Sequence, residues 1–208
     1  MILIGQYDSP FVRRVAIALT LYDLPFEHRP WSSFGDADEL RALNPLTRVP
    51  TLILDDGDVL VDSHCIIDHL DSLVPAGRAM FPRVEPDRRR ALGIAALASG
   101  IGDKAVSLFY EQAMHQTPSE PFMARCRMQI AAGLAALESE RAARPTDYWF
   151  GARIGHADIV VATVLRFIGD VHPALSSAAT YPALAAHAHR LEALPVFQAI
   201  QQPFIAPT

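Results

Sequence analysis

Cysteine is scarce in this chain of 208 residues, which holds only Cys65 and Cys126 and no CxxC pair. A disulfide framework needs several paired cysteines and a structural zinc site needs clustered ones, so neither is indicated. A surplus of basic residues is also lacking, because 18 Lys and Arg stand against 23 Asp and Glu for a formal net charge of −5. Since nucleic-acid binding depends on neutralising phosphates, we expect no nucleic-acid partner.

A leader segment and long apolar runs are missing as well. The opening residues, MILIGQYDSPF, have no basic segment and no long apolar stretch, unlike a signal peptide. Apolar runs elsewhere fall short of the roughly 18 residues that a membrane span needs. No histidine pair has the HxxxH or HExxH spacing, so no metal is expected. We therefore expect a soluble, cytoplasmic protein with no membrane partner.

The first 75 residues alternate between short apolar runs and helical patterns, which predicts a small α/β domain. Asp56-Gly57 is a hairpin signal between two apolar runs. Helix starts are predicted at Pro10, after Ser9, and at Asp62-Ser63. The expected order over residues 1–75 is strand–helix–strand–helix–strand–strand–helix. The expected strands are residues 1–7, 26–29, 49–54 and 59–61.

The pattern changes after residue 75. Three prolines and one glycine lie between Pro75 and Pro86, so residues 76–86 are predicted to be a linker. Residues 87–208 contain no convincing strand and repeat apolar residues at helical spacing, which predicts an all-helical domain. The expected helices there are residues 88–114, 124–143, 154–168 and 181–194.

Three short motifs stand at element starts, and each has two interpretations. Ser9 can cap the helix after it, or its hydroxyl can face an anion such as a thiolate at the helix N-terminus. Pro50 can start a strand, or the Val49–Pro50 bond can be cis and leave the Val49 backbone to pair with an extended peptide. Asp62 and Ser63 can cap a helix, or hold the charged ends of an α-amino acid.

Together these motifs resemble those of the glutathione S-transferase superfamily. The matching stretches are SPFVRRVAIAL (9–19), NPLTRVPTLIL (44–54) and DSHCIIDHL (62–70), followed in the second half by GARIGHADIVVATVL (151–165). The resemblance covers essentially the whole chain. It implies a thioredoxin-like first domain that binds glutathione and an all-helical second domain that forms the electrophile pocket.

The resemblance also assigns roles to residues. Ser9 is implied as the catalytic residue that activates the glutathione sulfur, with Tyr7 as the alternative. The implied glutathione-binding residues are Arg48 near the glycine carboxylate, Val49 on the cysteinyl backbone, Pro50 as a cis proline, Asp62 and Ser63 at the γ-glutamyl end, and Asp103 from across a dimer interface. The candidates for the electrophile pocket are Tyr7, Phe11, Tyr110 and Met114.

Other polar residues receive structural interpretations. Gly155 and Asp158 are expected to start a buried helix, with the Asp158 carboxylate bonding the backbone there. Cys65 is expected to be a small buried residue. Arg13 and Arg14 are expected to be surface or domain-interface charges.

The function implied is that of a glutathione transferase involved in detoxification. Such an enzyme stabilises the glutathione thiolate and conjugates it to an electrophilic small molecule. Glutathione is then the co-substrate, a homodimer is expected, and no metal takes part. Two alternatives stay open: a glutathione-dependent isomerase, dehalogenase or peroxidase, and a non-catalytic interaction protein that binds a transcription or translation partner.

Overall fold

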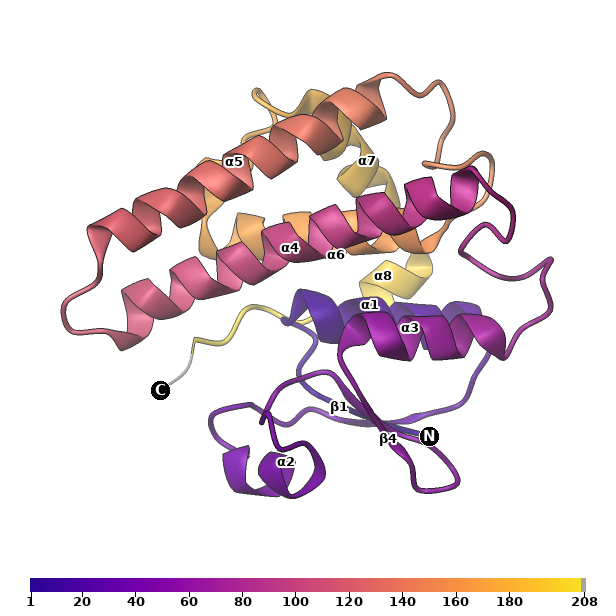
Figure 1. Ribbon diagram of the computed structural model, residues 1–208, viewed down its shortest axis with the longest axis horizontal. Coiled ribbons are helices and arrows are strands. Elements are labelled where there is room, and N and C mark those ends of the chain that lie inside the picture. Colours follow the sequence, from indigo (N-terminus) through magenta and orange to yellow (C-terminus); the bar gives the residue numbers. More distant parts are fainter. Residues whose placement is uncertain (207–208) are drawn as a thin grey trace. The chain divides into compact units, whose positions relative to one another are not determined.

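The computed structural model describes residues 1–206 (Figure 1). The chain divides into two compact units. The first unit contains Met1–Met80 together with the segment that begins at Leu194, and the second contains Phe81–Ala193.

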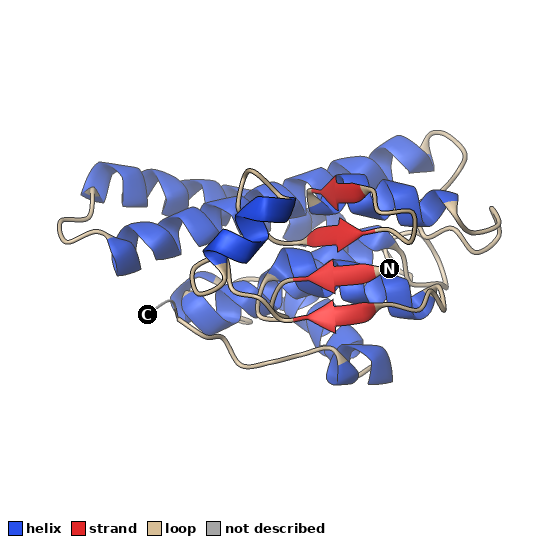
Figure 2. Ribbon diagram, turned by 90° about the horizontal axis from the view of Figure 1, so that it is seen from below, coloured by secondary structure: helices blue, strands red, loops and turns tan. Residues whose placement is uncertain are grey.

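The first unit is built on a mixed four-stranded sheet, which Figure 2 shows face-on. Its strands are β1 (Ile2–Ile4), β2 (Glu27–Arg29), β3 (Thr51–Ile53) and β4 (Val59–Val61), in the order β2-β1-β3-β4. β1 pairs parallel with β2 and antiparallel with β3, and β3 pairs antiparallel with β4. The predicted order of elements is confirmed, but the strands at 1–7 and 49–54 are shorter than predicted.

Three helices cover this sheet: α1 (Pro10–Leu21), α2 (Ala37–Leu43) and α3 (Ser63–Ser72). α1 and α3 pack side by side on one face of the sheet, and α2 lies on the other (Figures 1 and 2). Val12, Val15 and Leu19 of α1 are fully buried, as their helical spacing predicts. This packing holds the N-terminal ends of α1 and α3 beside the sheet.

The second unit is helical, as predicted. Its elements are α4 (Asp87–Met114), α5 (Glu120–Ala142), α6 (His156–Val171), the short 3₁₀ helix η1 (Pro173–Leu175) and α7 (Pro182–Glu192). α4 packs against both α5 and α6, and α7 packs against α5 and α6. α6 is the core helix, because the residues from His156 through Val164 are all buried.

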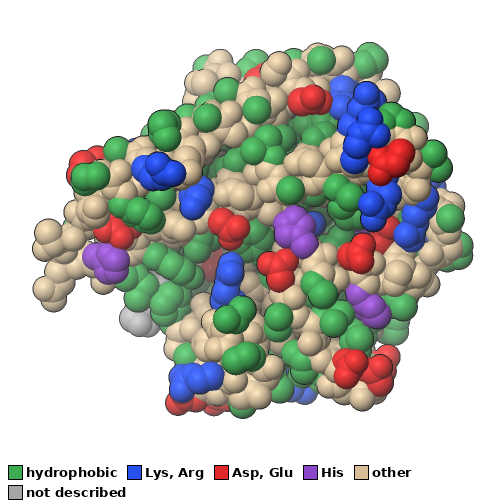
Figure 3. Space-filling view, viewed as in Figure 1, with side chains coloured by type: hydrophobic (Ala, Val, Ile, Leu, Met, Phe, Trp, Pro, Cys, Tyr) green, Lys and Arg blue, Asp and Glu red, His purple; other side chains and the backbone are tan. Residues whose placement is uncertain are grey.

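α4 is the one helix of the described residues that is long and apolar enough to cross a membrane, by length and composition alone. This is a weak indication, because core helices of soluble proteins have the same properties. Exposed hydrophobic side chains lie along α4 and α5, among them Leu97, Tyr110 and Met128. On the face in Figure 3, basic side chains gather at the end where α4 begins.

The C-terminal segment differs from its prediction. Residues 194–208 were expected in the helical domain, but α8 (Pro195–Ala199) and the residues after it belong to the first unit; residues 207 and 208 lie outside the described residues. Phe197 is fully buried, and Arg13 donates hydrogen bonds to the backbone oxygens of Phe197 (3.0 Å) and Ile200 (2.7 Å). These contacts explain why the segment returns to α1.

The expectation for Cys65 is wrong, and one alternative for Arg13 and Arg14 is excluded. Arg13 and Arg14 are not surface charges, because their side chains are only 3% and 1% exposed. Cys65 is exposed on α3, whereas Cys126 is buried in α5. The helical spacing of α3 explains Cys65, since Ile66, Ile67 and Leu70 supply the buried face.

Candidate active site

Three chain segments meet where β1 and β4 end and β3 begins, at one end of the strands of the sheet. The strand register places Ile4, Thr51 and Val61 in one row across β1, β3 and β4. β1 leaves this row toward Ser9, the chain enters it from Val49-Pro50, and β4 leaves it toward Asp62-Ser63. The three motifs identified in the sequence therefore all lie next to the same end of the strands.

Gly5 makes the approach between two of these segments possible. Its φ is +130°, and a Cβ placed on it would lie 2.4 Å from Val12 Cγ2 and 2.8 Å from Val49 Cβ. A side chain at this position would clash with both, so only glycine fits. The close contact fixes the spacing between the β1–α1 loop and Val49.

Ser9 is the N-cap of α1, and its Oγ accepts a hydrogen bond from the Val12 N–H at 3.4 Å. A hydroxyl that accepts in this way still carries its own proton. Ser9 is partly exposed, so this proton can be donated to a ligand at the helix N-terminus. Both interpretations of Ser9 from the sequence, cap and anion partner, are therefore compatible in one geometry.

The loop before β3 is held by Asn44. The Val49–Pro50 bond is cis. Asn44 is 1% exposed, and its Nδ2 donates to the Arg48 backbone oxygen (2.9 Å) and to Thr51 Oγ1 (3.1 Å). Arg48 itself is exposed.

The start of α3 combines a strained backbone with a buried cation. Asp62, the N-cap, has a φ of +71°, a region that non-glycine residues rarely adopt, and its Oδ1 accepts from the His64 N–H at 2.7 Å. Behind it, Arg14 Nη1 donates to the Ser63 Oγ at 3.3 Å. Burial lowers the pKa of Arg14 to about 10, opposed by the nearby Asp62 carboxylate. The helix dipole and this guanidinium favour an anion beside Ser63.

Tyr7 lies near Ser9 but in a different setting. Its ring stacks on His28 with a centroid distance of 3.9 Å, and His28 Nε2 lies 2.8 Å from the Gly5 oxygen. Burial raises the pKa of Tyr7 above its ordinary value, which makes its hydroxyl a weaker acid than an exposed tyrosine. Phe11 follows on the first turn of α1 and is partly exposed.

The remaining candidates lie on α4 in the second unit. Asp103 is exposed, and Tyr110 and Met114 are 38% and 49% exposed. Tyr110 and Met114 are four residues apart and share a helix face. A cavity of about 460 Å³ also exists in this unit, between α6 and α7, lined in part by Arg166, Tyr181 and His189, and it includes none of the candidates.

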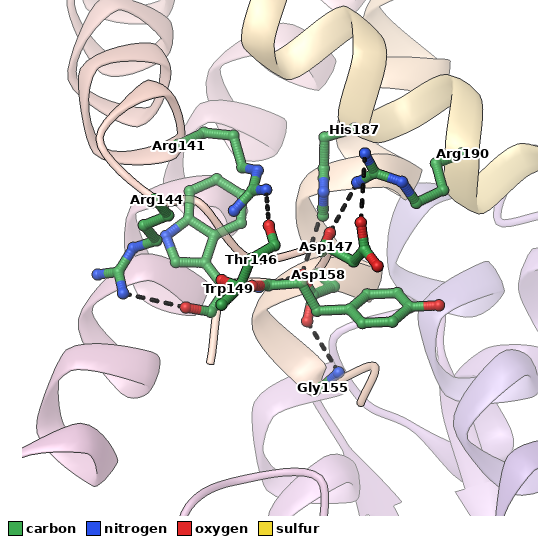
Figure 4. A network of polar contacts seen from close by, with 10 residues as sticks. Arg141, Arg144, Thr146, Asp147, Trp149, Gly155, Asp158, His187 and Arg190 are labelled. Carbon is green, nitrogen blue, oxygen red and sulfur yellow. Dashed lines mark hydrogen bonds and ion pairs between the residues drawn. The ribbon is translucent and has the colours of Figure 1, made fainter. Parts of the chain in front are cut away.

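Asp158 is the centre of a second polar cluster, at the start of α6 (Figure 4). Its carboxylate accepts hydrogen bonds from the N–H of Gly155 and of Trp149, each at 2.8 Å, so its predicted backbone role is confirmed. Oδ1 also lies 3.4 Å from His187 Nε2. Burial raises the pKa of Asp158 to about 6, although its hydrogen bonds lower it. Burial likewise lowers the pKa of His187 to about 3.

No group of three or more His, Cys, Asp or Glu side chains that could hold a metal ion occurs within residues 1–206. Sequence reasoning missed three supporting residues of the first unit: Gly5, Arg14 and Asn44. Asn44 and Arg14 lie inside the stretches that carry the family resemblance, which is the only signal that could have pointed to them.

The chain is similar to glutathione S-transferases along both units. A model described as the glutathione S-transferase N-terminal domain matches residues 3–78, and one described as the C-terminal domain matches residues 120–190. The uncharacterized GST-like protein YibF of Escherichia coli is 34% identical over 139 residues, which cover 66% of this chain and 68% of YibF.

Two further similarities extend over almost the whole chain. A probable maleylacetoacetate isomerase of Vibrio cholerae is 30% identical over 211 residues, 95% of this chain and 93% of the relative. A glutathione S-transferase of Methylobacterium radiotolerans, solved in complex with glutathione sulfonate, gives a TM-score of 0.90 at 30% identity over 100% of this chain and 98% of that chain. The predicted fold, thioredoxin-like and then helical, is thereby confirmed.

Proposed function

Because the chain belongs to the glutathione S-transferase family, we propose that it is a glutathione transferase acting on electrophilic small molecules. It binds glutathione at the first unit, stabilises the thiolate and joins the sulfur to an electrophilic carbon. Either a leaving group departs from that carbon with its electron pair, or the displaced electron pair moves to the neighbouring atom, which takes up the proton. The observation that carries this proposal is that Ser9, Val49 and Ser63 all lie beside the same end of the strands of the sheet.

Ser9 is the proposed catalytic residue. A free thiol has a pKa near 8.5, and each unit by which the site lowers it needs about 1.4 kcal/mol of preference for the thiolate. One hydrogen bond from a hydroxyl to a charged acceptor, together with the dipole of α1, supplies about one or two units. The raised pKa of Tyr7 favours Ser9 over Tyr7 as the sulfur's partner.

Other contacts orient glutathione. The proposed roles are an extended backbone pairing for Val49 beside the cis Pro50, a γ-glutamyl carboxylate at Ser63 and the α3 N-terminus, and the ammonium at Asp62. Asn44 and the cis bond hold this loop, and Arg14 supports Ser63. Arg48 is proposed for the glycine carboxylate, with its exposure as the supporting observation.

We further propose a cytoplasmic homodimer with a role in detoxification. Exposed hydrophobic side chains on α4 and α5, such as Leu97 and Met128, support association of two copies. Asp103 is exposed on α4, as a residue reaching a partner's glutathione must be. Tyr7, Phe11, Tyr110 and Met114 are proposed to contact the electrophile, and each is at least partly exposed.

Calorimetric titration with reduced glutathione near pH 7 tests binding first. A Kd of about 1 mM or tighter is expected. Ser9→Ala should retain glutathione, raise the pKa of the bound thiol by about one unit, and lower the rate with chlorodinitrobenzene at pH 7 about tenfold. Ser119→Ala is the matched control, because Ser119 is the N-cap of α5 and makes no side-chain cap bond. An unchanged thiol pKa in Ser9→Ala contradicts the proposed role.

A glutathione-dependent isomerase is the second candidate, supported by the similarity to the Vibrio cholerae relative. Conjugation consumes glutathione, whereas isomerisation returns it, so measuring free thiol after turnover of maleylacetoacetate separates the two. The non-catalytic alternative predicts no glutathione binding at about 10 mM.

A further inference from the structure

Residues Gln202 and Ile205 lie beside the loop that carries Ser9. Arg13 anchors α8 through the Phe197 and Ile200 oxygens, and its guanidinium lies 5.4 Å from the Phe197 ring centroid. The residues that follow Ile200 are thereby directed toward the β1–α1 loop of the same unit.

Two hydrogen bonds then join this segment to the residues immediately before Ser9. The Tyr7 N–H donates to Gln202 Oε1 at 2.9 Å, and the Ile205 N–H donates to Asp8 Oδ2 at 3.0 Å. In the first bond the C-terminal segment supplies the side-chain acceptor, and in the second bond the β1–α1 loop supplies it. Residues 7 and 8 are therefore clamped, although they belong to neither β1 nor α1.

We propose that Gln202 is a positioning residue that sets where the Ser9 hydroxyl points, and this proposal rests on the proposed function of Ser9. The bond from Ser9 Oγ to its own helix, at 3.4 Å, is too long to fix the hydroxyl firmly. A hydrogen bond to the sulfur depends on placement within about 0.5 Å, so a second restraint on the preceding peptide matters.

The chemistry of Gln202 suits this role. An amide oxygen accepts the Tyr7 N–H and adds no second negative charge to that of the Asp8 carboxylate beside Ser9. Gln202 is partly buried, while its neighbour Gln201 is exposed. The two glutamines thus provide a test and a matched control one residue apart.

The experiment compares Gln202→Met with Gln201→Met in the full-length protein. Methionine keeps the length of the side chain and removes the acceptor. For Gln202→Met we expect the pKa of bound glutathione, followed by ultraviolet thiolate absorbance, to rise by about half a unit and kcat with chlorodinitrobenzene to fall about threefold at pH 7. The KM for glutathione should stay within about twofold. Gln201→Met should match the parent protein.

A double-mutant cycle with Ser9→Ala shows whether Gln202 acts through Ser9. If it does, Gln202→Met has no further effect on the thiol pKa once Ser9 is alanine. An effect of equal size in that background overturns the proposal, because the substitution then acts elsewhere. Equal behaviour of the two methionine variants overturns it as well.

Amide hydrogen exchange at the Tyr7 N–H separates failure of the clamp from failure of the proposed function. Faster exchange at Tyr7 in Gln202→Met, but not in Gln201→Met, is expected from loss of the acceptor. Unchanged exchange at Tyr7 overturns the clamp whatever the activity. Faster exchange together with a Ser9→Ala variant of unchanged thiol pKa shows instead that the clamp exists and that Ser9 is not the sulfur's partner.

Discussion

Each unit contains a helix that begins with an aspartate nearby, and the two aspartates have opposite surroundings: Asp62 is the N-cap of α3, and Asp158 lies in the first turn of α6. Asp62 at the start of α3 is exposed, and its Oδ1 accepts a hydrogen bond from the His64 N–H. Asp158 at the start of α6 is 1% exposed and binds the N–H groups of Gly155 and Trp149. The first carboxylate faces solvent at a helix start whose next residue, Ser63, is 3% exposed, whereas the second carboxylate is enclosed by the protein.

The comparison shows that an aspartate at a helix start can serve ligand binding when it is exposed and stability when it is buried. At α3, the positive φ of Asp62 and the buried cation of Arg14 lie at a helix start whose N-cap residue is exposed. Backbone strain and a buried charge both oppose folding, so their presence at an exposed edge is typical of a functional site. At α6 the same kind of carboxylate is enclosed, and its hydrogen bonds serve stability.

Replacing the two aspartates by alanine gives the largest contrast. Asp158→Ala removes the acceptor of the buried Trp149 N–H and of the partly buried Gly155 N–H, and it should lower the free energy of unfolding by about 3 kcal/mol. Asp62→Ala should cost about 1 kcal/mol or less in stability but weaken glutathione binding about tenfold. Denaturant unfolding and calorimetric titration measure both. Equal loss of stability in the two variants would remove the distinction between the two helix starts.

The acid response of the Asp158 cluster provides the next test. The folded pKa of Asp158, about 6, lies above its ordinary 3.8, so protonating it as pH falls through 6 stabilises the fold. The folded pKa of His187, about 3, lies below its ordinary 6.5, so acidification below 6.5 destabilises the fold. The two effects oppose each other between about pH 4 and 6 and should nearly cancel in the parent protein.

Single substitutions should reveal the effects of Asp158 and of His187 on stability separately. His187→Gln should become more stable from pH 6 toward 4, and Asp158→Asn should become less stable over the same range, by up to about 2 kcal/mol each relative to pH 7. Melting temperatures across pH 4–7 provide the measurement. Parallel pH profiles for the two variants would mean that the cluster does not titrate as described.

Arg14→Met tests the contribution of the buried cation at the start of α3. Removing a buried cation relieves its desolvation, so stability should change by less than about 1 kcal/mol. Ser63 loses its donor and the site loses a positive charge, so the KM for glutathione should rise about tenfold. Steady-state kinetics with varied glutathione checks this. Arg48→Met, at an exposed position, should raise the KM less.

Thiol labelling gives the smallest effect. Cys65 is exposed on α3, so a maleimide should label it in the folded protein, and Cys65→Ser should leave stability within about 0.5 kcal/mol. Cys126 is buried in α5 and should react only after unfolding. Rapid double labelling under native conditions would show that α5 opens locally.

The fold followed from the sequence where local patterns determine it. The alternating runs before residue 75 and the helical spacing after residue 86 predicted both units, and the Asp56-Gly57 turn predicted the β3–β4 hairpin. The return of the C-terminal segment was not predictable in this way. Its anchor, the bond from Arg13 to Ile200, joins residues separated by 187 positions, and a lone arginine in a helix gives no sign of so distant a partner.

In the candidate site too, residues within local motifs could be predicted, whereas residues whose role depends on a distant partner could not. Ser9, Val49-Pro50 and Asp62-Ser63 could be named because each stands at an element boundary within a recognisable motif. Arg14 and Gly5 could not, because their importance depends on what lies across from them: Ser63 for Arg14, and Val49 for Gly5. Cys65 was misjudged because a single apolar residue in a helix can face either way.

The discontinuous first unit also has a consequence during synthesis. A ribosome makes the chain from its N-terminus, so the sheet and α1 emerge long before α8 does. Until the whole second unit has been translated, the Arg13 guanidinium lacks the Phe197 and Ile200 carbonyls, and Tyr7 lacks Gln202. A nascent chain can therefore form most of the first unit early, but the loop around Ser9 acquires these restraints only after residues 197–205 have been made.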